Sequence, residues 1–409
     1  MEQFISRPFK LYNKIQHYDW GTKNENAFIP VLLGEKAQAD TPYAELWIGT
    51  HPKAPSEIEY DGNKISLNQL IEKHPVKCLG SYASHKFSNQ FPFLLKVLSA
   101  ARALSIQTHP DKTQAQKLHA EDPKNYPDDN HKPEIAIAVD SLVAVAGFRP
   151  VGEIVENLRS LTELNNFIGK EAIEKILSSR DEKDSAQYIR DLYGNIMRKA
   201  EEKESLPNCI NNIRERLKNK KSLTGEEEQF LKQYELFGPD IGLLSFFFFN
   251  IIRLKPGQAI YTAAGVPHAY INGNIIECMA NSDNVVRAGL TNKFKDVKTL
   301  LEIVKYDFKH YEIINSEQKT DEVTYKTGAE EFEVSSYRKP AGSKRKIKTE
   351  DKPFVCLVTG GTVEIKWELN GEKFMQKFSK GESFFVPAAL AECEIFIVDT
   401  AEYFLVTIP

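Results

Sequence analysis

The sequence predicts a mixed α and β fold in which strands predominate and a helical block interrupts them. Short apolar segments separated by Gly, Pro and Asn fill residues 9–103, a pattern typical of strands joined by turns. Apolar residues at three- and four-residue spacing then occupy residues 151–237, which predicts amphipathic helices. The strand pattern returns at Gly242 and continues to the C-terminus, apart from a helix expected in DVKTLLEIVKY. This order favours an α+β protein with an inserted helical domain.

The changes of pattern also predict the domain boundaries. A chain of 409 residues exceeds one ordinary core, so we expect roughly two to three domains. A discontinuous strand-rich domain is expected at residues 1–150 and 238–315, a helical insertion at 151–237, and a second strand-rich domain at 316–409.

A weak internal repeat indicates that one β fold occurs twice. The segments KPGQAIYTAAGVPHAY and SKGESFFVPAALAECEI each predict a turn, an apolar strand, a bend and another strand. Double-sheet jelly rolls consist of such short antiparallel strands. When Gly257 is aligned with Gly381, His268 falls opposite Glu392, so we expect only the first copy to keep a metal ligand.

Three further segments have expected secondary structure. SLNQLIEKHPVKCLG, before the strand FPFLLKVLSA, predicts one short helix, and TQAQKLHA predicts another. The run GLLSFFFFNIIRL is shorter than the about 20 apolar residues that span a bilayer, so we interpret it as a buried strand.

Composition excludes several functional classes. A net charge of −4 gives no electrostatic reason to expect nucleic acid or an anionic membrane as a partner. The five cysteines are widely spaced and form no CxxC pair, which favours reduced thiols in the cytoplasm over a disulfide framework. The N-terminal segment MEQFISRPFKLYN lacks the apolar core of a signal peptide.

Four residues form a candidate metal site. Gln107 and His109 are two positions apart in an expected strand, so both side chains lie on one side of it. Glu134 enters the next apolar run, and His268 follows a glycine-proline bend. Zinc accepts imidazole and carboxylate ligands, whereas an amide oxygen is a less common ligand. The alternative is that both histidines are ordinary hydrogen-bonded residues at sheet ends.

A second polar cluster lies in ECMANSDNVVRAGLTNKFKDV. Arg287 precedes Ala-Gly, which permits close approach of a ligand to the backbone, and Lys293 follows six residues later. Two cations beside a metal site suggest recognition of a phosphate. The alternative is a loop in which these cations pair with Asp283 and Glu277.

Several long motifs occur in an order that is specific to one family. They are YDWGTKNENAF, AELWIGTHPKAPS, FPFLLKVL, LSIQTHPDK, DDNHKPEIAIA, GFRP, PGQAIYTAAGVPHAY and ANSDNVVRAGLTNKF. Together they resemble the type I mannose-6-phosphate isomerases (phosphomannose isomerases) from about Tyr18 to Val297. The resemblance implies duplicated cupin-type jelly-roll domains with a helical domain. It also implies one zinc ion per chain and interconversion of mannose 6-phosphate and fructose 6-phosphate.

The resemblance carries specific residues with it. By motif it places Gln107, His109, Glu134 and His268 on the metal and makes Arg287 the catalytic arginine. The bend before His268 departs from the family, because Thr-Ala stands where a proline is more usual, but no ligand is lost.

The isomerisation moves a proton between C1 and C2 through an enediol, so it needs proton carriers and a hold on the phosphate. Arg287 stays protonated and is assigned to anion stabilisation. The base is left open among four further catalytic candidates: Lys132, His131, Tyr270 and Asp283. The substrate-binding candidates are Ser105, Lys96, Lys293 and Glu277.

Two rival functions remain at this point. One is another cupin enzyme such as an iron oxygenase, and the other is a non-catalytic sensor of sugar phosphates. The glutamine ligand and the Arg/Lys cluster count against the oxygenase, and the complete ligand set counts against the sensor. We expect a small sugar phosphate as partner, no organic cofactor and a monomer.

Overall fold

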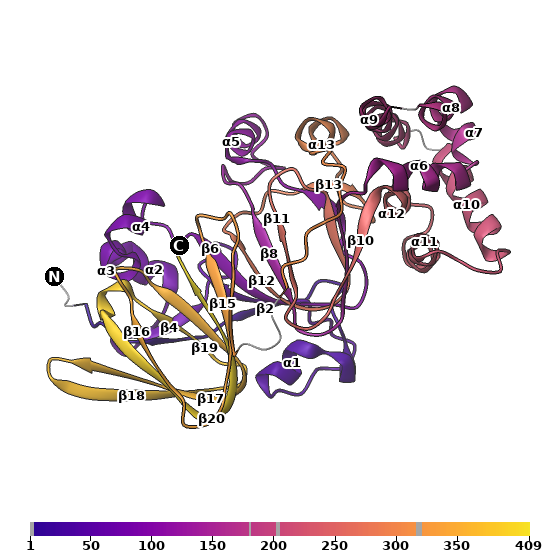
Figure 1. Cartoon of the computed structure of the whole chain (residues 1–409). Coiled ribbons are helices and arrows are strands. Elements are labelled where there is room, and N and C mark those ends of the chain that lie inside the picture. The colour runs from indigo at the N-terminus through magenta and orange to yellow at the C-terminus, as the bar shows by residue number, and fades with distance from the viewer. Residues whose placement is uncertain (1–3, 180, 202–204, 316–320) are drawn as a thin grey trace.

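The computed structural model describes residues 4–179, 181–201, 205–315 and 321–409. It is a mixed α/β structure whose strands pair antiparallel (Figure 1). The larger sheet has the order β10-β9-β12-β6-β3-β2, with β7 and β8 paired to β12, β11 to β8, and β13 to β7. Its strands are β2 (Lys14–Gln16), β3 (Glu45–Gly49), β6 (Phe93–Ala100), β7 (Ile106–Thr108), β8 (Glu134–Ala138), β9 (Leu142–Phe148), β10 (Phe249–Leu254), β11 (Ala259–Thr262), β12 (His268–Ala280) and β13 (Val286–Gly289).

The second sheet contains mainly C-terminal strands. Its order is β1-β19-β17-β20-β15-β14, with β16 paired to β20 and β18 to β17. Because β1 pairs with β19, the N-terminal segment joins this sheet, a contact that no local pattern predicted. The strands are β1 (Phe9–Leu11), β14 (Glu322–Tyr325), β15 (Glu333–Lys339), β16 (Lys344–Lys348), β17 (Phe354–Leu369), β18 (Glu372–Ser379), β19 (Ser383–Val386) and β20 (Glu392–Thr407); β4 (Glu57–Tyr60) and β5 (Asn63–Ser66) form a separate hairpin.

The helical pattern of residues 151–237 is confirmed as secondary structure. In Figure 1 these helices gather at the end of the molecule opposite β18. Their buried side chains share one continuous core with the larger sheet, where Leu158 and Ile189 belong to the same cluster as Phe148 and Ile271. The helices are α6 (Val151–Ser160), α7 (Leu164–Ile168), α8 (Lys170–Ser178), α9 (Glu182–Lys199), α10 (Ser205–Lys218) and α11 (Gly225–Phe237).

Shorter helices lie elsewhere. Two of them, α5 (Lys112–Glu121) and α13 (Val297–Ile303), are the helices that the sequence predicts. The others are α1 (Phe28–Leu33), α2 (Leu67–Lys73), α3 (Pro75–Leu79), α4 (Ser81–Lys86) and α12 (Ser245–Phe248), with 3-10 turns η1 (Asn24–Asn26), η2 (Ile241–Leu244) and η3 (Ala388–Leu390).

Two local predictions were wrong. The single helix expected at residues 66–80 is divided into α2 and α3, because Pro75 lacks an N–H and begins a new helix at its first position. The strand expected from Gly242 begins only at Phe249, after η2 and α12. A continuous apolar run has no periodicity that distinguishes a buried helix from a buried strand.

The internal repeat is visible as a repeated succession of elements. β11 leads through a bend to the long strand β12, and β19 leads through η3 to the long strand β20. His268 and Glu392, which the alignment places opposite each other, each begin the long strand. The predicted boundary at residue 316 lies outside the described residues. Among those described, no helix combines the length and the apolar character needed to cross a membrane.

Candidate active site

Strand pairing brings three distant motifs to one place. On the larger sheet, His268 of β12 pairs with Gln107 of β7, and Gln107 pairs in turn with Arg287 of β13. Directly opposed residues in antiparallel strands project to the same face. Gln107 therefore lies between His268 and Arg287 on one face of the sheet.

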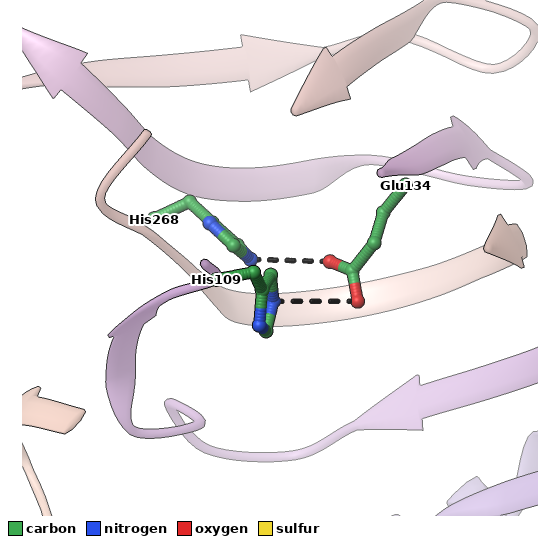
Figure 2. Close-up of side chains that lie close together, drawn as sticks. All are labelled: His109, Glu134 and His268. Carbon is green, nitrogen blue, oxygen red and sulfur yellow. Dashed lines mark hydrogen bonds and ion pairs between the residues drawn. The ribbon is translucent and has the colours of Figure 1, made fainter. Parts of the chain in front are cut away.

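The side chains of the two histidines meet that of Glu134 (Figure 2). His268 Nε2 lies 3.1 Å from one carboxylate oxygen of Glu134, and His109 Nε2 lies 3.5 Å from the other. The three ligand atoms are within 4.8 Å of one another, and each residue is only 1% exposed. Such a spacing permits all three side chains to bind one ion.

Hydrogen bonds to backbone carbonyls fix the orientation of both rings. His109 Nδ1 lies 2.7 Å from the carbonyl oxygen of Asn284, and His268 Nδ1 lies 2.9 Å from that of Val266. A carbonyl oxygen only accepts, so each Nδ1 carries a proton, and in the neutral ring each Nε2 then presents its lone pair to Glu134.

The electrostatics of this cluster fit a cation. Burial lowers the pKa of His109 to about 4, so its Nε2 carries no proton at neutral pH, and this nitrogen makes no hydrogen bond among the described residues. Burial by itself would raise the pKa of Glu134, but its polar contacts, the charge of Lys132 first among them, outweigh it and hold that pKa well below the usual value. Two imidazole lone pairs facing an ionised carboxylate repel it unless a cation lies between them. The donor set suits zinc.

A clasp between two loops supports the cluster. Asp128 accepts hydrogen bonds from the hydroxyl of Ser282 (2.7 Å), the backbone N–H of Asp283 (2.7 Å) and the amide of Asn284 (3.0 Å). The carbonyl oxygen of Asn284 accepts the hydrogen bond from His109 Nδ1. The clasp therefore helps to orient His109, a candidate metal ligand. The same clasp fixes the backbone of Asp283.

A cavity of about 440 Å³ opens over this part of the sheet. Most of the residues predicted for catalysis or substrate binding line it, and aromatic and apolar residues such as Trp20 and Leu236 join them. His109 and His268 do not line it. The predicted residues on its wall are Lys96, Ser105, Gln107, Lys132, Glu134, Tyr270, Glu277, Asp283, Arg287 and Lys293.

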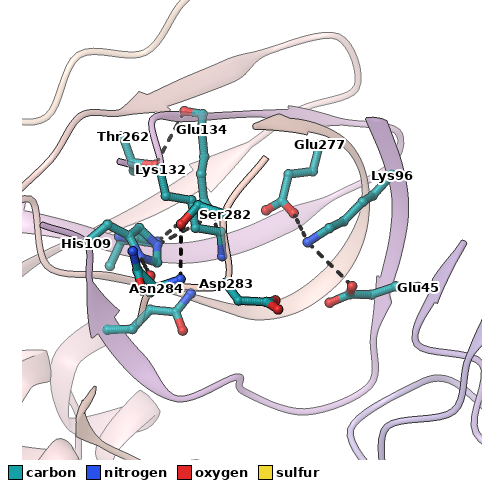
Figure 3. A network of polar contacts seen from close by, with 12 residues as sticks. Glu45, Lys96, His109, Lys132, Glu134, Thr262, Glu277, Ser282, Asp283 and Asn284 are labelled. Atoms are coloured by element: carbon teal, nitrogen blue, oxygen red, sulfur yellow. Dashed lines mark hydrogen bonds and ion pairs between the residues drawn. The ribbon is translucent and has the colours of Figure 1, made fainter. Parts of the chain in front are cut away.

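The predicted substrate ligand Lys96 is already paired with carboxylates (Figure 3). Its Nζ lies 3.1 Å from Glu277 and 3.5 Å from Glu45, and the three side chains are at most 9% exposed. Burial alone would lower the pKa of Lys96, but these two carboxylates outweigh it and raise that pKa. Burial raises the pKa of Glu277.

The other cavity cations differ in their pairing. Lys132 Nζ lies 3.1 Å from Glu134. Arg287 and Lys293 form no ion pair within the described part of the chain, so the expected alternative of a loop salt-bridged to Asp283 and Glu277 is not seen there. Burial lowers the pKa of the Arg287 guanidinium. The Lys293 ammonium lies 5.9 Å from the centre of the Tyr18 ring.

Two predicted proton carriers are in different surroundings. His131 does not line the cavity, because its Nε2 lies 2.6 Å from Glu331, which belongs to the segment before β15. Tyr270 does line it, but burial raises the pKa of this phenol well above its usual value, so it stays protonated.

Sequence reasoning missed three polar residues of this region: Glu45, His51 and Asp128. A signal for His51 existed, since Thr-His-Pro occurs both at residues 50–52 and around His109. Asp128 stands in the motif DDNHKPE that was already singled out. Glu45 stands in the quoted motif AELWIGTHPKAPS, but one acidic residue in a strand does not reveal which charges it will face in space.

Comparisons with known proteins agree on one family. A model described as phosphomannose isomerase type I, catalytic domain, matches residues 8–151. Mannose-6-phosphate isomerase of Mus musculus is 38% identical over 87% of this chain and 88% of its own length, and that of Saccharomyces cerevisiae is 37% identical over 92% and 93%.

Solved structures agree with these sequence relatives. A point mutant of phosphomannose isomerase from Salmonella typhimurium superposes with a TM-score of 0.85 at 28% identity, covering 99% of this chain and 100% of that one. A zinc-bound mannose 6-phosphate isomerase matches with a TM-score of 0.84 at 28% identity, covering 98% of this chain and 99% of that one.

Proposed function

The chain belongs to the type I phosphomannose isomerases, and from this premise we propose that it interconverts mannose 6-phosphate and fructose 6-phosphate. The proton moves between C1 and C2 of the open-chain sugar through an enediol. The observation that carries the proposal is the buried His109–Glu134–His268 cluster beside a cavity. The wall of this cavity carries Arg287 and Lys293, two cations that form no ion pair among the described residues.

We propose one zinc ion per chain, held by His109, Glu134 and His268, with Gln107 as fourth ligand. Gln107 lies on the same face as His268 and lines the cavity, which supports its inclusion. A bound zinc ion supplies Lewis-acid polarisation of the sugar carbonyl. The ammonium of Lys132 lies beside Glu134, and its positive charge helps to keep this carboxylate ionised.

The phosphate and the developing negative charge need cations that are not already neutralised. Arg287 and Lys293 meet this need within the described residues, whereas Lys96 faces two carboxylates. We therefore assign anion binding to Arg287 and Lys293, with Ser105 as a hydrogen-bond donor on the same wall. Lys96 is assigned to holding Glu277 in place.

Proton transfer is assigned to groups on the cavity wall. Burial raises the pKa of Glu277 above its usual value, and its carboxylate lines the cavity, which suits a group that both takes and returns a proton. Asp283 is ionised and faces the cavity, which suits an acceptor for sugar hydroxyls. His131, bonded to Glu331, is assigned to orienting the segment that carries Lys132.

The finer features of the family complete the proposal. We propose that each sheet region is a cupin-type jelly roll, that residues 151–237 form a helical insertion domain, and that the enzyme works in the cytoplasm as a monomer. The two copies then differ in function, because His268 has Glu392 as its counterpart.

Formation of fructose 6-phosphate from mannose 6-phosphate, followed through a coupled dehydrogenase, tests the function. Turnover that is lost on chelation and restored by zinc is the expected result. Absence of turnover with zinc loaded would favour the sensor, and oxygen consumption with iron would favour the oxygenase.

A further inference from the structure

Asp283 reaches the cavity wall with its carboxylate held at both oxygens. His51 Nε2 lies 3.2 Å from one oxygen, and Lys53 Nζ lies 2.7 Å from the other. Burial alone would raise the pKa of Asp283, but the hydrogen bonds from His51 and Lys53 outweigh it and hold that pKa well below its usual value. Each carboxylate oxygen has a further lone pair available to a ligand in the cavity.

The two partners of Asp283 differ in their surroundings. The side chain of Lys53 is 68% exposed, so its ion pair is screened by solvent and salt. The side chain of His51 is 4% exposed, and its ring packs edge-on against Trp47 with 4.5 Å between ring centres. His51 is therefore the fixed contact and Lys53 the adaptable one.

A backbone hydrogen bond determines which nitrogen of His51 carries the proton. The N–H of Lys53 donates to His51 Nδ1 at 3.3 Å, so Nδ1 is the acceptor. In the neutral ring the proton is then on Nε2, which donates to Asp283. The ring is thus already set as a donor before any ligand enters the cavity.

We propose that His51 is a positioning residue of the isomerase, which holds the Asp283 carboxylate in one orientation toward the substrate through its Nε2–H. The other contacts of Asp283, from Asp128 and from the exposed Lys53, do not fix the orientation of its carboxylate. The Asp128 clasp fixes the backbone of Asp283 but not its side chain. Asp283 lines the same cavity as the Lys132–Glu134 and Glu45–Lys96 pairs that are drawn with it in Figure 3, so its carboxylate shares this wall with other charges.

A fixed Asp283 carboxylate would make the enzyme selective for the orientation of the sugar hydroxyl groups. A carboxylate with both outer lone pairs occupied and its plane fixed accepts sugar hydroxyls from a narrow range of directions. This inference rests on the proposed function, because it assumes that the ligand of the cavity is a phosphorylated sugar.

A matched pair of substitutions separates the proposed contact from general packing. In His51→Gln the side-chain amide reaches the position of Nε2 and can donate to Asp283. In His51→Asn the amide reaches only the position of Nδ1, so the donor to Asp283 is lost. We expect kcat/KM for mannose 6-phosphate to fall about 10-fold or more in His51→Asn and to recover most of the wild-type value in His51→Gln.

A double-mutant cycle tests whether His51 acts through Asp283. In an Asp283→Ala background, His51→Asn should change kcat/KM by less than about twofold, because the group that it orients is gone. Zinc content and the thermal midpoint are measured for each variant, since a purely structural role would move these and leave the losses additive.

Three results would overturn the inference: additive losses in the cycle, equal activity of the Gln and Asn variants, or wild-type activity in His51→Asn. A wild-type enzyme without isomerase activity would instead refute the proposed function, so the two failures are distinguishable.

Discussion

Replacing Lys96 with Met tests whether this lysine binds substrate or holds the cavity wall together. Met keeps a similar length and removes the charge between Glu45 and Glu277, whose oxygens lie 3.5 and 3.1 Å from Nζ. Removing one partner of a buried ion pair costs about 3 to 5 kcal/mol, because an uncompensated charge stays buried. We expect the thermal midpoint of Lys96→Met to fall by several degrees.

The loss should depend on pH in one direction. Without Lys96 the folded-state pKa of Glu277, already raised by burial, rises further above its unfolded value. A group with a raised folded pKa adds stability below its unfolded pKa and loses it as pH rises through the folded pKa. The difference in midpoint between Lys96→Met and wild type should therefore be larger at pH 8 than at pH 5.

Lys293→Met is the matched control, because Lys293 lines the same cavity without an ion pair among the described residues. Its thermal midpoint should stay near that of wild type, while KM for mannose 6-phosphate rises about 10-fold or more, as expected for a lost charge-assisted hydrogen bond. The reasoning is refuted if Lys96→Met raises KM with an unchanged midpoint at both pH values, since Lys96 would then be a phosphate ligand.

Further predictions concern the metal and the strand that carries the arginine. Chelation should abolish turnover, and added zinc should restore it. His268→Ala should lose both zinc, measured by elemental analysis, and turnover; full activity in a metal-free variant would contradict this. Arg287→Lys keeps the charge but loses the planar fork, so kcat should fall about 10-fold or more. In Gly289→Ala the new Cβ would clash with the backbone of Gly242, so both kcat and the thermal midpoint should fall; an unchanged midpoint would show that the two segments separate at little cost.

The sequence predicted the parts of the fold that depend on local pattern. The helices between residues 151 and 237, together with α5 and α13, follow from the spacing of apolar residues. This spacing is a local signal, because it involves residues close together in the sequence. The prediction was wrong where the pattern was uniform, as in the Phe-rich run before β10. Pairing of β1 with β19 was not predictable, because about 370 residues separate the two strands and no local signal encodes a partner.

In the candidate site, too, local sequence pattern predicted some features, and contacts between distant segments determined the others. Spacing placed Gln107 and His109 on one strand face, and the glycine-proline bend made His268 their candidate partner. Resemblance to a family then supported the same set. The structure adds what neither source contains, namely that Glu277 and Glu45 neutralise Lys96, whereas Lys293 forms no ion pair with any residue that the structure describes. Charge pairing between strands depends on register, and register is set by the whole sheet.

The two Thr-His-Pro triplets show how backbone context, rather than residue type, decides the chemistry of a histidine. His109 Nδ1 faces the carbonyl of Asn284, so its Nε2 has a free lone pair and can bind a cation. His51 Nδ1 faces the N–H of Lys53, so its Nε2 carries a proton and donates to Asp283. Both rings are buried, and both Nε2 atoms point to a carboxylate. One carboxylate can therefore share a metal ion with its histidine, whereas the other is oriented by a hydrogen bond.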